Sequence, residues 1–150
     1  KVMLDIDYKA EGKRAARSTA RLLRKTKMER QSLFFLYDYR DAPALHRMNK
    51  KIQFMMRAYN REDVDGIFNQ GIEVPVIHAD AKFYSDSLMG VIRGKGIRLW
   101  MNALGKYDKM EKTEKNSGFD ALLQMRHTNI IQTDLYKELM DYLKVRGLHR

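Results

Sequence analysis

The sequence has no cysteine, only two prolines and no long apolar segment in its 150 residues. The absence of cysteine excludes disulfide bonds, a cysteine-ligated zinc site and a thiol nucleophile, so stability must come from side-chain packing. No apolar run approaches the roughly 20 residues needed to cross a bilayer, which argues against a transmembrane segment. No linker rich in proline or glycine interrupts the chain, and we predict a single domain over residues 1–150.

Acidic residues are in the minority. The chain has 19 Asp and Glu against 29 Lys and Arg, and its formal net charge is +10. A charge of this size favours an anionic partner, and nucleic acid, a phosphorylated metabolite and an acidic membrane surface are the three candidates. Charge alone does not choose among them.

Short apolar runs rich in β-branched and aromatic residues recur along the chain and predict six strands. Most are almost continuously apolar, as the strands of a parallel sheet are when both of its faces are covered. Helix signals lie between the runs, among them a capping box of Ser117 with Asp120 and a helix cap at Asp134. The predicted strands are Val2–Ile6, Leu33–Tyr37, Ile52–Met56, Val74–Ile77, Ile97–Met101 and Asn129–Gln132.

Six βα units can form an open doubly wound sheet, which would be complete at this length, or part of a TIM (β/α)₈ barrel, which normally needs about 250 residues. Polar residues follow every predicted strand. In a parallel barrel all strand ends share one rim, whereas an open sheet concentrates functional residues at one switch point. The pattern favours an α/β partial barrel with about six βα units. The polar residues are Asp7, Lys9, Asp38, Arg40, Arg57, Asn60, His78, Asp80, Asn102, Thr133 and Asp134.

The first predicted strand has an unusual charge pattern. Its period of two places Asp5, Asp7 and Lys9 on the same face. Charges in an apolar layer are costly unless they are paired or bind a metal. One interpretation is a carboxylate ligand for a hard divalent cation beside a lysine that holds a phosphate. The other is an Asp–Lys ion pair at the solvated end of the strand.

Three motifs in order resemble the C-terminal part of the glycerophosphodiester phosphodiesterase family. They are Asp7-x-Lys9 after an apolar strand, Trp100-x-Asn102 on a late strand, and the segment 130–134 (Ile-Ile-Gln-Thr-Asp) before the last helix. The family has a TIM (β/α)₈ barrel with a Glu-x-Lys pair on its third strand, a Trp and Asn motif on its seventh and Thr-Asp after its eighth. The resemblance therefore implies barrel strands three to eight.

The resemblance also implies roles for individual residues. Asp7 takes the place of a metal-binding glutamate, Lys9 that of a lysine on the substrate phosphate, and Trp100 and Asn102 line the substrate pocket. The cofactor implied is a divalent cation, Ca²⁺ or Mg²⁺, and the substrate is a small-molecule glycerophosphodiester that is hydrolysed to an alcohol and sn-glycerol 3-phosphate. Aspartate is one methylene shorter than the family's glutamate, which reduces its reach to the metal.

The family's two catalytic histidines lie on its first strand and shortly after its second, and neither segment has a counterpart in this sequence. We therefore interpret the chain as a fragment whose partner is the missing N-terminal segment of the same protein. A partial barrel would otherwise leave two strand edges unpaired. Many relatives with a long loop after the seventh strand are exported bacterial enzymes, so the resemblance favours a periplasmic or secreted location.

Two further residues are assigned to the substrate pocket. His78 follows a predicted strand beside Asp80, and we interpret it as a hydrogen-bonding pocket residue and as a secondary candidate for acid–base catalysis. Tyr37 ends the second predicted strand and is expected to line the same pocket, although aromatic residues there are as often core caps. The charged stretch from Gly105 to Gly118 is interpreted as a rim loop or short helix.

Two alternative functions stay open. The basic run from Lys13 to Arg30 could bind nucleic-acid phosphates. Against this, Ala16, Ala20 and Leu23 form the apolar stripe that an outer barrel helix needs, and no stacking aromatics are interleaved with the charges. Nucleic acid is therefore not the favoured partner. The second alternative is a non-catalytic barrel that keeps a phosphate pocket.

Overall fold

The computed structural model describes residues 3–7 and 12–149. The chain divides into two compact units, residues 1–83 and 84–150, which we call the first unit and the second unit. In the described part of the chain, six strands alternate with helices, and each strand lies within two residues of its predicted position. Among the described residues, no helix is long and apolar enough to cross a membrane.

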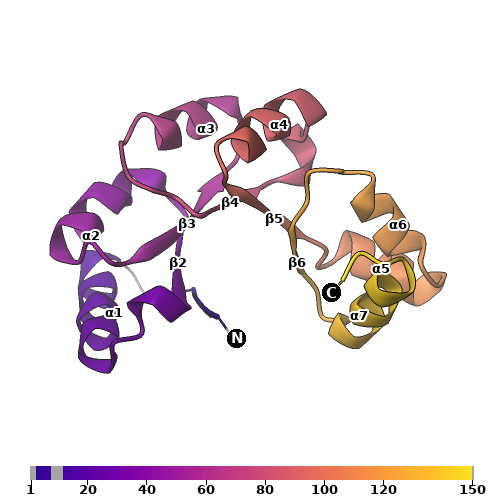
Figure 1. Cartoon of the computed structure of the whole chain (residues 1–150), viewed down its shortest axis with the longest axis horizontal. Coiled ribbons are helices and arrows are strands. Elements are labelled where there is room, and N and C mark those ends of the chain that lie inside the picture. The colour runs from indigo at the N-terminus through magenta and orange to yellow at the C-terminus, as the bar shows by residue number, and fades with distance from the viewer. Residues whose placement is uncertain (1–2, 8–11, 150) are drawn as a thin grey trace. The chain divides into compact units, whose positions relative to one another are not determined.

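The first unit contains four parallel strands that pair in chain order. The register places Phe34 beside Phe54 and Met56 beside Ile77, and all four side chains are fully buried. The helices of this unit lie along one side of these strands (Figure 1). Its elements are β1 (Leu4–Ile6), α1 (Gly12–Thr26), β2 (Ser32–Leu36), α2 (Ala42–Met48), β3 (Gln53–Ala58), α3 (Arg61–Phe68) and β4 (Val76–Ala79), with 3₁₀ turns at Glu29–Gln31, Tyr39–Asp41 and Ala81–Phe83.

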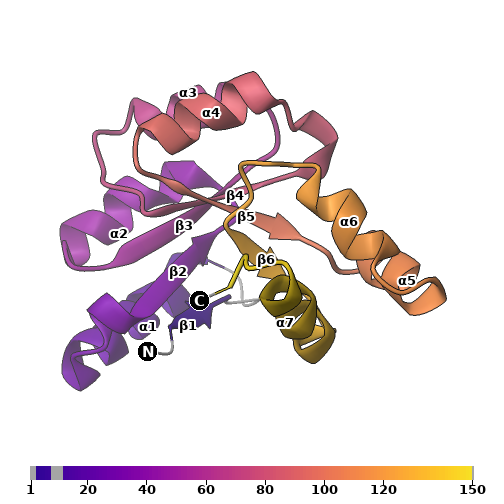
Figure 2. The same ribbon diagram turned by 45° about the vertical axis from the view of Figure 1, so that its right-hand side comes forward.

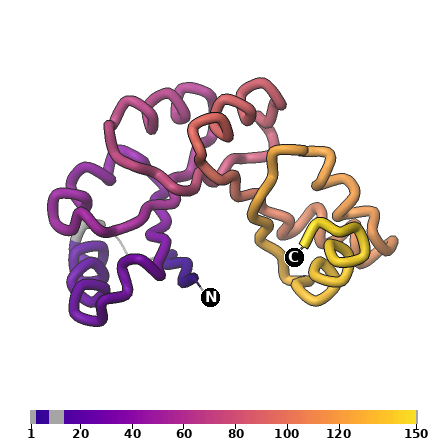
Figure 3. The backbone as a smooth tube through the Cα atoms, in the orientation of Figure 1, coloured from indigo at the N-terminus to yellow at the C-terminus, as the bar shows by residue number. Residues whose placement is uncertain are grey.

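Helix α1 buries Ala16, Ala20 and Leu23, which confirms the apolar stripe predicted for an outer helix. It ends where Lys27 adopts a positive φ of 57° and the Met28 N–H donates to the Leu23 carbonyl. This is the hydrogen bond that closes a helix after a left-handed residue. The smooth trace in Figure 3 follows the alternation of strand and helix through this unit.

The second unit contains two parallel strands, with Trp100 in register with Ile130. Phe119, Leu139 and Tyr142 form its buried cluster, and Ile131 and Leu135 pack against it. Figure 2 shows α7 beside β6, and α5 packed against α6. Its elements are α4 (Asp86–Gly94), β5 (Arg98–Asn102), α5 (Lys106–Thr113), α6 (Ser117–Leu123), β6 (Ile130–Gln132) and α7 (Tyr136–Val145).

Two predicted helix caps in this unit are wrong. Ser117 does not cap a helix with Asp120, because α6 already begins at Ser117 after Asn116, and the Ser117 hydroxyl donates to the carbonyls of preceding residues. Asp134 does not cap the last helix, because Leu135 occupies that position. The Asp134 N–H instead donates to the buried carboxylate of Asp108. The stretch from Gly105 to Gly118 is largely helical and contributes α5 and the start of α6.

Candidate functional site

The carboxyl ends of β1 to β4 lie at one edge of the first unit because these strands run parallel and pair in order. Five polar side chains belong to these ends. We call them the first-unit rim: Asp7, Tyr37, Arg57, His78 and Asp80. Arg57 and His78 are direct register partners on β3 and β4. In parallel α/β folds, this edge is where ligands bind.

Asp7 and Tyr37, both predicted as site residues, are in contact. The Tyr37 hydroxyl donates to the Asp7 carboxylate, at 3.1 Å from one oxygen and 3.3 Å from the other. The Tyr37 ring packs edge-on against Phe35, with ring centroids 4.6 Å apart. Both polar side chains are exposed, so this pair presents a carboxylate and a phenol to solvent. The contact orients Asp7 without removing it from the surface.

Arg57 links the ends of β3 and β4. Its guanidinium lies 3.6 Å from the Asp80 carboxylate and stacks over the Tyr59 ring at 4.6 Å. Both partners of this ion pair are only 28% exposed, so the pair is partly desolvated. The Nε atom of Arg57 is buried and has no hydrogen-bond partner among the described residues. A buried donor without an acceptor is costly, so the Arg57 Nε–H is suited to donate to an oxygen atom of a ligand.

His78 is buried at the same edge, with its ring 5.6 Å from the Phe35 ring. Burial and, to a lesser extent, the positive charge of Arg57 lower the pKa of His78 to about 4, and the negative charge of Asp80 opposes the shift. The imidazole is therefore neutral at physiological pH. A neutral imidazole can exchange hydrogen bonds with a ligand, but it is not a general acid near pH 7.

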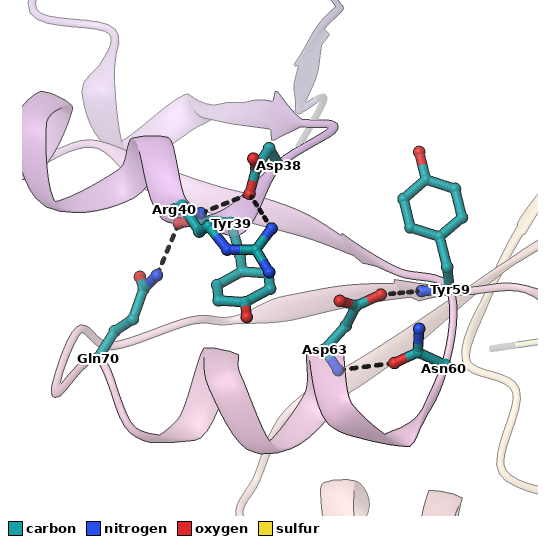
Figure 4. A network of polar contacts seen from close by, with 7 residues as sticks. All are labelled: Asp38, Tyr39, Arg40, Tyr59, Asn60, Asp63 and Gln70. Atoms are coloured by element: carbon teal, nitrogen blue, oxygen red, sulfur yellow. Dashed lines mark hydrogen bonds and ion pairs between the residues drawn. The ribbon is translucent and has the colours of Figure 1, made fainter.

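The loops after β2 and β3 are held by local hydrogen bonds, which Figure 4 shows. The Arg40 N–H donates to Asp38 at 2.9 Å, and the Tyr59 N–H donates to Asp63 at 2.8 Å. Asn60 caps α3 by accepting from the Asp63 N–H at 2.9 Å. These turns fix where the backbone leaves the strands, and the Tyr59 ring stands clear of them (Figure 4).

The second unit holds the two other predicted pocket residues. The Trp100 indole N–H donates to the Gln132 side chain at 3.4 Å, and the indole is half-buried. Asn102 is exposed, and its side-chain oxygen accepts from the Leu104 N–H at 2.7 Å. Asn102 therefore also shapes the turn after β5. Convergence of these residues with Asp7 on one phosphate stays a prediction.

The described residues do not by themselves form a metal centre. Among residues 3–7 and 12–149, no three His, Asp or Glu side chains group closely enough to hold a metal ion. Asp7 can offer one carboxylate, which is fewer ligands than Ca²⁺ takes from a protein, whereas Mg²⁺ is commonly held by one or two carboxylates together with substrate phosphate oxygens. Lys9, the predicted phosphate ligand, lies outside the described residues.

Arg57 and Asp80 are among the polar residues predicted at the strand ends, but neither was predicted as a site residue. The signal for Arg57 was a charge inside the otherwise buried stretch of β3. Asp80 follows His78 by two residues, a spacing that places both near the end of one strand. Their pairing depends on the register between β3 and β4, which the sequence does not give.

The fold is similar to that of several solved structures. A glycerophosphoryl diester phosphodiesterase from Parabacteroides distasonis aligns with a TM-score of 0.79 and 18% identity, over 97% of this chain and 52% of its own. A glycerophosphodiester phosphodiesterase from the same organism aligns at 0.65 and 14% identity, over 97% and 58%. A protein from Galdieria sulphuraria, provisionally assigned the same activity, aligns at 0.73 and 10% identity, over 96% and 57%.

A scan against protein-family models finds no match, and no curated protein sequence matches significantly. At these identities the structural similarity establishes the fold alone. The chain spans about half the length of the solved proteins that it resembles. The predicted fold class is confirmed: the chain has the fold of part of a TIM (β/α)₈ barrel of the type found in glycerophosphodiester phosphodiesterases.

Proposed function

We propose that this chain is the C-terminal part of a glycerophosphodiester phosphodiesterase, and that the parent protein hydrolyses glycerophosphodiesters to an alcohol and sn-glycerol 3-phosphate. The main support is the similarity of fold over 97% of the chain to a phosphodiesterase of which it spans 52%. The order of the motifs at Asp7, Trp100 and Thr133 adds independent support. Fold alone does not assign a reaction, so the proposal depends on the rim residues as well.

The proposed roles follow from the chemistry at the strand ends. Lys9 is proposed to supply a positive charge for the substrate phosphate, and Arg57 to add a guanidinium donor on the first-unit rim. The buried Nε of Arg57, which lacks an acceptor among the described residues, supports an oxyanion ligand at this edge. Trp100 and Asn102 are proposed to line the pocket that takes the rest of the substrate.

His78 is proposed as a hydrogen-bonding residue and not as the general acid. Its pKa of about 4 keeps the imidazole neutral near pH 7, so the acidic proton of an imidazolium is absent. The general acid and base are therefore expected in the missing N-terminal segment. For the same reason, the chain alone is expected to bind phosphate compounds without turning them over.

A divalent cation, Ca²⁺ or Mg²⁺, is part of the proposal, with Asp7 as one ligand and the remaining ligands from the N-terminal segment. Asp7 is exposed and held by Tyr37, which keeps its carboxylate at the surface. The described residues provide no complete site. The cation is therefore proposed as a property of the parent, and its removal is a direct test.

The test is an assay of the parent protein on glycerophosphocholine and glycerophosphoethanolamine, with release of sn-glycerol 3-phosphate as the readout. Turnover of at least one of these substrates is expected, and EDTA is expected to abolish this turnover. Added Ca²⁺ or Mg²⁺ should restore it. Turnover unaffected by the chelator would contradict the metal assignment, and no release from either substrate would contradict the proposed reaction.

A further inference from the structure

A groove of about 440 Å³ lies between α1 and α2 in the first unit, and none of its lining residues belongs to the first-unit rim. Buried Ala16 and Leu45 form part of its apolar floor. Arg17 and Arg21 line one wall, and Arg47 lines the other. The volume lies within the range of about 300–1,000 Å³ that is typical of small-molecule sites.

The arginines of α1 form a row that faces α2. Arg17 and Arg21 are four residues apart, which places them on the same helix face. Arg24 lies one turn further along α1, and its guanidinium donates to the Met48 carbonyl at the end of α2. This contact shows that the helix face with these arginines is turned toward α2. Arg47 approaches from α2 itself. Arginine side chains from two helices therefore line one groove.

Positive charge exceeds negative charge in the lining, where Arg17, Arg21 and Arg47 stand against Asp41. Helix α1 contains six Lys and Arg residues and no Asp or Glu. Within the described residues, no ion pair joins Arg17, Arg21 or Arg47 to a carboxylate. Like charges one helical turn apart destabilise a helix, so an anion in the groove would remove this cost.

We propose that the groove between α1 and α2 binds a small organic phosphate that also has hydroxyl or amino groups. The planar forks of Arg17, Arg21 and Arg47 match phosphate oxygens in bidentate geometry. The apolar floor takes the organic part of the ligand. Asp41 is the acidic residue in the lining, and its carboxylate accepts hydrogen bonds from ligand hydroxyl or amino groups.

A small ligand fits these observations better than a nucleic acid. The groove is concave, and its lining contains no aromatic side chain on which a base could stack. Single-stranded binders combine a long basic channel with such aromatics, and here the arginines surround one short groove. Nucleic-acid binding is therefore the competing outcome that the experiment must separate.

The experiment is isothermal titration calorimetry of the 150-residue chain with ADP and with glucose 6-phosphate at 150 mM salt. Saturable binding of either compound that depends on the groove arginines is expected. The double variant R17Q/R47Q should weaken it at least tenfold, because each charged hydrogen bond to phosphate contributes about that factor or more. Adenosine and glucose, which lack the phosphate, should not bind.

The matched control is R61Q/K109Q, which removes the same charge from exposed positions away from the groove. It should change the affinity less than twofold. Asp41→Asn should shift the preference toward inorganic phosphate and away from ADP and glucose 6-phosphate, because it removes a negative charge from the lining and weakens the acceptor for ligand hydroxyl and amino groups. Circular dichroism checks that each variant is folded. No saturable binding of either compound, equal weakening by both double variants, or tighter binding of single-stranded RNA at the same salt would overturn the proposal.

Discussion

Acid should destabilise the first unit through His78 before most carboxylates are protonated. The imidazole is 6% exposed and its folded pKa is about 4, against 6.5 for an unperturbed histidine. At pH 7 it is neutral in both the folded and the unfolded chain, so it contributes no pH dependence. Below pH 6.5 the unfolded chain takes up a proton that the folded chain does not, and the free energy of unfolding falls.

The size of this effect follows from the shift. Each pH unit between the two pKa values changes the free energy of unfolding by about 1.4 kcal/mol. From pH 7 to pH 5 we therefore expect a loss of about 2 kcal/mol from His78 alone. Below pH 4 its contribution levels off because the folded chain is protonated as well. Losses in that range come from carboxylates such as Asp86, whose pKa is lowered by its hydrogen bonds with Arg126.

The assay is urea unfolding followed by circular dichroism at pH 7 and at pH 5, for the chain and for His78→Gln. The variant cannot take up this proton, so its loss of stability over the same interval should be smaller by about 2 kcal/mol. NMR titration of the His78 ring gives the pKa directly. Arg57→Gln should raise it and Asp80→Asn should lower it, because these charges act in opposite directions. An imidazole that titrates near 6.5 would refute the reasoning.

Three further predictions concern the rest of the chain. Gly118→Ala should destabilise the second unit by about 2 kcal/mol in urea unfolding, because a Cβ there would meet the Tyr107 carbonyl where α5 packs on α6. An unchanged urea midpoint would contradict this prediction. Asp108→Ala should lower the free energy of unfolding by about 2 kcal/mol, because the buried carboxylate accepts from the Thr133 hydroxyl at 2.6 Å and from a backbone N–H. Thr133→Ala removes only one of these bonds and should lower it less, and equal decreases for the two variants would argue against that order. Lys27→Gly should raise the free energy of unfolding by about 0.5–1 kcal/mol, because glycine adopts the positive φ of 57° without strain. A lower urea midpoint would show that the lysine side chain contributes more to stability than the backbone strain costs.

The strands were predictable because their signal is local. In β2, five consecutive residues are buried, and such an apolar run marks a strand wherever the neighbouring elements lie. Helix α2 is short and was not among the predicted elements, although Pro43 in its first turn is a typical start signal. The predicted cap at Asp134 was wrong for a different reason. The backbone N–H of Asp134 is bound by Asp108, a residue of another helix, which no local pattern reveals.

The candidate site was predictable in part. Placing Asp7 and Tyr37 at neighbouring strand ends required only the βα pattern, and the structure brings them into contact. The pair of Arg57 with Asp80 and the burial of His78 depend on which residues stand opposite one another across β3 and β4. Register is set by packing between segments far apart in the sequence, so these features could not be predicted from the chain alone.

The most direct test of the central claim is the kcat/KM of the parent protein for glycerophosphocholine after Lys9→Ala. Lys9 is proposed to contact the substrate phosphate, and loss of a charged contact made in the transition state should lower kcat/KM about 100-fold. Lys25→Ala, at the end of α1, should leave it unchanged. A Lys9→Ala parent that retains the wild-type kcat/KM would contradict the claim that the ends of these strands form the phosphodiesterase site.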